Sequence, residues 1–80
     1  MNREECGRQR YKVRYVIRAI LDARGLSMAE LGRRIGVTAE AVSATVLGKR
    51  HSPRVLEALR REGVPEECLF DPRKTRDKPA

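Results

Sequence analysis

The chain has 80 residues, and its 18 Lys and Arg against 11 Asp and Glu give a formal net charge of +7. A domain of this length buries only about 60–65 % of the surface of its unfolded chain, which leaves little room for both a core and an enclosed catalytic pocket. The surplus of positive charge favours a polyanionic partner, either a nucleic acid or an acidic membrane surface.

Both ends of the chain are polar, and we predict that they are disordered in the free protein. Residues 1–10 form a mobile basic arm in this interpretation, residues 11–70 form the folded domain, and residues 71–80 (DPRKTRDKPA) form a disordered basic tail. The pattern leaves two roles open for the cations of the arm, a solubilising segment or an arm that enters a DNA groove. These cations are Arg3, Arg8, Arg10 and Lys12.

Between the ends, apolar residues recur at helical spacing, and no strand pattern competes with it. Residues 11–24 are predicted to form an amphipathic helix that ends at Gly25. Tyr11 and Tyr15 are expected to cover the core. The buried face of this helix is expected to contain Val13, Val16, Ile17, Ile20 and Leu21.

Two further helices are predicted, and each begins after a residue typical of helix N-caps and ends at a glycine. One begins after Ser27 and ends at Gly36. The next covers residues 39–47, after Thr38 as its N-cap, and ends at Gly48.

A fourth helix is predicted to begin at Ser52-Pro53, where proline tolerates the first helical position, and to end at Gly63. A last turn brings Leu69 and Phe70 against the bundle. The sequence therefore predicts an all-α fold, a compact bundle of four to five short helices.

The second and third predicted helices are joined only by Gly36-Val37-Thr38, and so short a turn sets two helices at a steep angle, as in a helix-turn-helix. That motif needs a small residue where the helices approach and a glycine in the turn, which Gly32 and Gly36 supply. We expect a positive φ at Gly36 and no space for a side chain at Gly32. The predicted structural residues of the motif are Leu31, Gly32, Ile35, Gly36, Val37, Val42, Val46 and Gly48.

Residues 17–59, with the segment GLSMAELGRRIGVTAEAVSATVLGKR, resemble the DNA-binding domain of phage Cro and repressor proteins, the XRE-like or lambda-repressor-like family. The segment HSPRVLEALRREGVPEECLFDP is similar to the Ner-like regulators of transposable phages. The resemblance implies a five-helix domain that represses a phage or prophage promoter by occlusion. The chain departs from the family pattern at Met28, where members usually carry Gln, and at Ala39 and Glu40, where Arg, Gln or Asn is frequent.

The resemblance implies that the third helix enters the major groove of double-stranded DNA. Phosphate contacts then supply most of the affinity, while base contacts supply the specificity. The predicted base contacts are Thr38, Ala39, Glu40, Ser43 and Ala44, and the predicted phosphate contacts are Ser27, Met28, Lys49, Arg50 and His51. Such a domain is expected to act as a homodimer, or as side-by-side copies on half-sites about one helical turn apart.

Other interpretations stay open. A DNA-architectural or recombination accessory factor needs the same fold and charge, and a helical protein-interaction module needs only the fold. Lys49 and Arg50 also suit a solvated loop whose cations complement the negative end of the preceding helix. No enzyme is expected, because the single histidine, His51, has no evident nucleophile as partner and no glycine-rich loop cradles a phosphate.

No cofactor, metal ion or small-molecule substrate is expected. The two cysteines and one histidine do not have the spacing of a zinc site. The sequence contains no apolar run of membrane-spanning length and no signal-peptide pattern, so a cytoplasmic protein with reduced Cys6 and Cys68 is expected, without a membrane partner.

Overall fold

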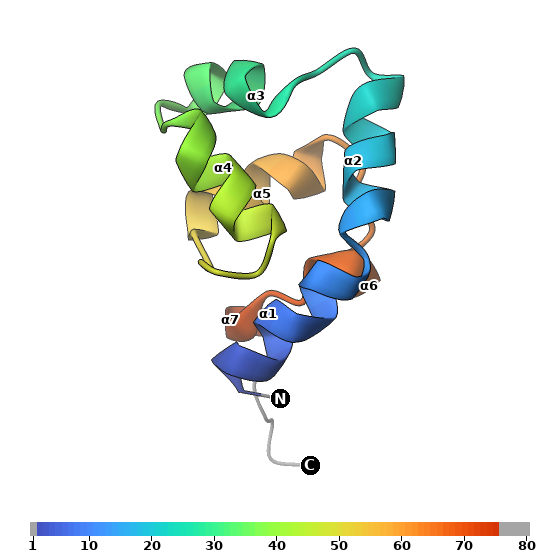
Figure 1. Cartoon of the computed structure of the whole chain (residues 1–80), viewed down its shortest axis with the longest axis vertical. Coiled ribbons are helices and arrows are strands. Elements are labelled where there is room, and N and C mark those ends of the chain that lie inside the picture. Colours follow the sequence, from blue (N-terminus) through green and yellow to red (C-terminus); the bar gives the residue numbers. More distant parts are fainter. Residues whose placement is uncertain (1, 76–80) are drawn as a thin grey trace.

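The computed structural model of the chain describes residues 2–75, in which the regular elements are all helices and no strand is present. Seven helical segments follow one another in this range: α1 (Arg3–Lys12), α2 (Arg14–Ala23), α3 (Met28–Ile35), α4 (Ala39–Val46), α5 (Pro53–Arg61), α6 (Glu66–Leu69) and α7 (Pro72–Thr75). Helices α2 to α5 surround a common core, while α1 extends from one end of α2 and lies beside α7 (Figure 1). The predicted all-α class is confirmed, although the chain is divided into more segments than four or five.

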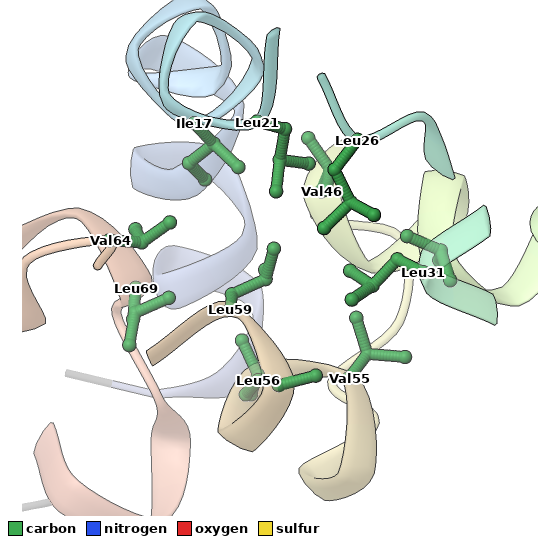
Figure 2. Packing of buried hydrophobic residues seen from close by; sticks show 12 residues of the cluster. Ile17, Leu21, Leu26, Leu31, Val46, Val55, Leu56, Leu59, Val64 and Leu69 are labelled. Carbon is green, nitrogen blue, oxygen red and sulfur yellow. The ribbon is translucent and has the colours of Figure 1, made fainter. Parts of the chain in front are cut away.

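The core is formed by apolar side chains from α2 to α6 that point toward one another (Figure 2). Burial of each large aliphatic side chain is worth about 1.5–3 kcal/mol, so this cluster is the main source of stability. Its buried members are Ile17, Leu21, Leu26, Leu31, Val42, Val46, Val55, Leu56, Ala58, Leu59, Val64 and Leu69.

Helices α3, α4 and α5 begin where the sequence predicts. The hydroxyl oxygens of Ser27, Thr38 and Ser52 accept hydrogen bonds from main-chain N–H groups three residues further on, at 3.0, 3.0 and 3.3 Å. Each bond satisfies a donor that has no partner within its helix. The predicted caps are therefore confirmed.

Residues 2–10 differ from the prediction of a mobile arm over residues 1–10, of which residue 1 lies outside the described range. Residues 3–12 form α1, whose first turn is capped by the Asn2 side chain, which accepts a hydrogen bond from the Glu5 N–H at 2.8 Å. The buried face of α1 consists of Cys6, Gly7 and Arg10. Because this face is not made of large apolar residues, helical periodicity does not reveal it.

The predicted single helix over residues 11–24 is also interrupted. At Val13 the backbone has φ −106° and ψ 15°, so α1 ends and α2 begins there. Tyr11 and Tyr15 are 46 % and 67 % exposed and do not cover the core as predicted. Both rings lie close to Arg14, whose guanidinium carbon is 3.7 Å from the ring centroid of Tyr11 and 4.3 Å from that of Tyr15.

The C-terminal part is ordered further than predicted. Leu69 is buried as expected, whereas Phe70 is half-buried in a left-handed conformation. Asp71 is buried, and its carboxylate pairs with Arg73 at 2.9 Å and with Arg60 at 3.4 Å. The tail predicted to be disordered over residues 71–80 thus starts with structured residues, and residues 76–80 lie outside the described range.

Candidate nucleic-acid interface

The joint between α3 and α4 is tightly packed. Gly36 ends α3 in the left-handed conformation with φ 78°, as predicted. The N–H of Val37 donates to the Gly32 carbonyl at 2.9 Å, and a Cβ on Gly32 would lie only 2.7 Å from the Val37 carbonyl oxygen. The requirement for glycine at position 32 is therefore confirmed, because any side chain there would push the turn away from α3.

The joint determines which side of α4 faces outward. Val42 and Val46 are fully buried, together with Leu31 of α3, while Ile35 and Val37 are half-buried against the core. Glu40, Ser43 and Ala44 lie on the opposite side of α4, and Thr38 and Ala39 lie at its N-terminal end. These five predicted base contacts together are called here the α4 face. Of these, Thr38, Ala39 and Glu40 are exposed, and Ser43 and Ala44 are half-buried.

Lys49 and Arg50 lie beside the α4 face. The loop that carries them folds back onto α4, since the N–H groups of both residues donate to the Ala44 carbonyl, at 2.9 and 3.2 Å. Both side chains are exposed, and neither forms an ion pair with another residue of the described range. A shallow hollow of about 380 Å³ joins these cations to Glu40, Ser43 and Ala44.

The other predicted phosphate contacts, Ser27 and Met28, lie away from the Lys49–Arg50 hollow, which neither of them lines. With Arg18 of α2 and Ser43 of α4 they line a second hollow of about 370 Å³. The Ser27 hydroxyl oxygen accepts the capping hydrogen bond, and its proton can still be donated to a phosphate, while the Met28 side chain packs against the core. Among the described residues, the exposed Arg18 is the one cation that lines this hollow.

Arg10 of α1 holds the Lys49–Arg50 loop in place through hydrogen bonds. The sequence does not predict this role for Arg10. The side chain is 0 % exposed and makes five hydrogen bonds. Its Nη1 donates to the carbonyls of Thr45 and Arg50, both at 2.9 Å. Its other nitrogens donate to the carbonyls of Leu69 at 2.7 Å and Phe70 at 3.1 Å, and to the His51 ring.

Burial lowers the pKa of Arg10, while the neighbouring Cys6 and Asp71 raise it. Arginine nevertheless keeps its proton in proteins. A buried charge is tolerated when its donors are all used. Nothing in the polar sequence around Arg10 signals this role, because its partners are main-chain carbonyls.

His51 belongs to the same arrangement. Its Nδ1 lies 2.9 Å from Nη2 of Arg10, and since a guanidinium only donates, Nδ1 is the acceptor and carries no proton. Burial, followed by the charges of Arg10 and Arg3, lowers the pKa of His51. The ring is therefore neutral near pH 7, and it holds the loop in place. Because the ring is neutral, it offers no positive charge to a phosphate, and the predicted phosphate contact of His51 gains no support from its charge.

The lowered pKa of His51 predicts a pH-dependent stability. The unfolded chain takes up its proton near pH 6.5, before the folded chain does, so lowering the pH through about 6.5 favours unfolding until the folded ring is protonated. We expect the thermal midpoint to fall between about pH 7 and pH 5.5. Because His51 is the only histidine, His51→Gln, which keeps an acceptor for Arg10, should remove this fall. An equal fall in both proteins would contradict the assignment.

Comparisons of the chain with protein-family models, with curated proteins and with solved structures return no match. None of the helices in the described range is both long and apolar enough to cross a membrane. Residues 2–75 also bring together no group of three or more His, Cys, Asp or Glu side chains able to hold a metal ion.

Proposed function

We propose that the protein is a sequence-specific regulator of transcription that binds double-stranded DNA, with α3 and α4 as its helix-turn-helix. The observation that carries this proposal is the joint at Gly32 and Gly36, which buries one side of α4 and leaves the α4 face exposed beside Lys49 and Arg50. A helix presented in this way fits the major groove, which admits one α-helix. The net charge of +7 favours the same partner.

In this proposal the α4 face reads the bases. Between Thr38 and Leu47 there is no Arg, Lys, Asn or Gln, so the bidentate contacts with guanine and adenine are missing. What remains are two hydroxyl groups, two alanine methyl groups that suit thymine, and Glu40, which can accept a hydrogen bond from the cytosine amino group. The expected sequence preference is therefore modest.

The proposed site of action is a phage or prophage promoter, where a bound protein blocks transcription by occlusion. A single copy of this domain covers one half-site. Because its sequence preference is modest, we expect two copies to bind together, as a homodimer or side by side, on half-sites about 34–36 Å apart. The cytoplasm is the matching compartment.

The missing bidentate residues also favour a second candidate, a DNA-architectural or recombination accessory factor with little sequence preference. A titration of the wild-type protein against two duplexes at equal ionic strength separates the candidates. One duplex carries the DNA upstream of the protein's own gene, and the other has random sequence. Preference by a factor of about 10³, the low end for specific proteins, supports a regulator. Equal binding supports the architectural factor, and absence of binding to both leaves a helical protein-interaction module and overturns the proposal.

Replacing Lys49 and Arg50 together by Gln tests the phosphate contacts. If both side chains neutralise phosphates, the slope of log affinity against log salt should become shallower by about 0.9 for each, or about 1.8 in total. Specific and random DNA should lose affinity by similar factors. If the two cations only complement the end of α4, the slope stays unchanged and stability falls by a few tenths of a kcal/mol, about the size of an exposed helix-dipole interaction. The salt titration and a thermal unfolding curve of the same variant decide between these outcomes.

A further inference from the structure

A third hollow lies on the far side of the Lys49–Arg50 loop, between that loop and α1. It encloses about 720 Å³ and is called here the basic groove. Within the described range, four cationic side chains line it, against a single carboxylate, that of Glu4. The four cations are Arg3, Arg8, Lys12 and Lys49, and all of them are exposed.

These cations are available to a ligand. The only ion pair among them within the described range joins Arg8 to Glu4 at 4.0 Å, with side chains 62 % and 81 % exposed. Exposed pairs of this kind are worth about 0–1 kcal/mol, so a phosphate can displace the carboxylate easily. Charge complementarity therefore favours a polyanion in the basic groove over an apolar or cationic partner.

The walls of the basic groove are held at a fixed separation. The backbones of Gly7 in α1 and Gly48 in the loop touch, since a Cβ on Gly7 would lie 2.3 Å from the Gly48 carbonyl oxygen. One turn further along α1, Arg10 bonds the carbonyls of Thr45 and Arg50. Helix α1 therefore presents its cations in place before a ligand arrives, which lowers the entropy cost of binding.

The basic groove is continuous with the proposed DNA-reading surface. Leu47 lines all three hollows described here, and Lys49 lines both the basic groove and the hollow over the α4 face. The tract thus runs from Ser27 across α4 to the cations of α1. A helix inserted into the major groove lies between two sugar–phosphate backbones, so cations next to α4 are where phosphates would be met.

We propose that α1 is part of the DNA interface, and that the basic groove holds the sugar–phosphate backbone of the strand that flanks the major groove beside α4. In this arrangement Arg3, Arg8 and Lys12 contact phosphates beyond those that Lys49 and Arg50 reach. The inference rests on the proposed function, and it enlarges the interface from a two-helix motif to one in which a third, N-terminal helix takes part.

The test is the salt dependence of binding to a short random-sequence duplex, measured for the variant Arg8→Gln/Lys12→Gln. Arg24→Gln/Arg61→Gln is the matched control, because it also removes two exposed cations and neither residue lines any of the three hollows. We expect the slope of log affinity against log salt to become shallower by about 1.8 in the first variant and to stay near the wild-type value in the control. Thermal unfolding of both variants should match the wild type.

The outcomes separate this inference from the proposed function. If the wild-type protein binds and Lys49→Gln/Arg50→Gln reduces the slope while Arg8→Gln/Lys12→Gln does not, α1 lies outside the interface and only the inference is overturned. If the control loses as much slope as Arg8→Gln/Lys12→Gln, general attraction by net charge explains the effect, and the inference is overturned as well. If the wild-type protein binds no duplex, the proposed function itself fails.

Discussion

Replacing Arg10 by Met should bring the protein close to unfolding. Four main-chain carbonyls and the His51 ring would lose a donor together, and two of these hydrogen bonds are fully buried. Each buried acceptor left without a partner costs about 1–3 kcal/mol, so the two buried bonds alone predict a loss of about 2–6 kcal/mol. A small domain has only about 5–15 kcal/mol in total. The thermal midpoint should therefore fall by at least about 8 °C, as followed by circular dichroism.

Two further variants make the Arg10 experiment specific. Arg8→Met removes the same group from an exposed position of the same helix, and it should leave the midpoint nearly unchanged. Arg10→Lys keeps the charge, but one ammonium group cannot reproduce the fork that reaches α4, its following loop and the end of α6 at once. It should lie between wild type and Arg10→Met. If Arg10→Met and Arg8→Met have the same thermal midpoint, the hydrogen bonds of Arg10 do not hold these segments together.

The helices α3 to α5 could be predicted because their signals are local. Ser27, Thr38 and Ser52 each act on a main-chain N–H three residues away, and Gly36 ends α3 through its own φ angle. The need for glycine at position 32 was also predictable, since it follows from the shortness of the turn. Each of these features can be recognised within a window of a few residues.

Helix α1 could not be predicted in the same way, because its contacts lie far along the chain. Arg10 is 35 residues from Thr45 and 59 from Leu69. Its partners are carbonyl groups, which every residue has, so the sequence shows nothing of the pairing. Cationic positions in a polar segment are typical of a solvated arm, and the pattern that reveals an amphipathic helix needs apolar residues that α1 does not have.

In the candidate site too, some features follow from local signals, whereas others depend on contacts between residues far apart in the sequence. The exposure of Glu40 follows from the helical repeat once Val42 and Val46 are known to be buried. Thr38 and Ala39 are exposed because they lie at the start of α4, which the predicted N-cap already locates. The basic groove depends on the docking of α1 onto the loop after α4, which no local signal predicts. The neutral state of His51 has the same origin, since Arg10 of α1 faces its ring.

The docking of α1 can be tested by a substitution that lowers stability only if α1 packs against the loop after α4. In an unpacked helix Gly→Ala is stabilising by about 0.5–1 kcal/mol, and in a mobile arm it is without effect on folding. In this structure the new Cβ at Gly7 would lie 2.3 Å from the Gly48 carbonyl oxygen and 3.2 Å from its carbon, so two backbones must separate.

Overpacking of this kind costs about 1–3 kcal/mol, and each kcal/mol corresponds to about 4–8 °C for a domain of this size. We therefore expect Gly7→Ala to have a distinctly lower thermal midpoint than the wild type. Arg8→Ala adds no atom at the contact, and its midpoint should be close to that of the wild type. Because the displaced backbone carries one wall of the basic groove, Gly7→Ala should also bind DNA with a shallower salt dependence. A midpoint of Gly7→Ala at or above that of the wild type would mean that α1 does not rest on the loop. An equal midpoint would indicate the mobile arm, and a higher one a helix that is not packed.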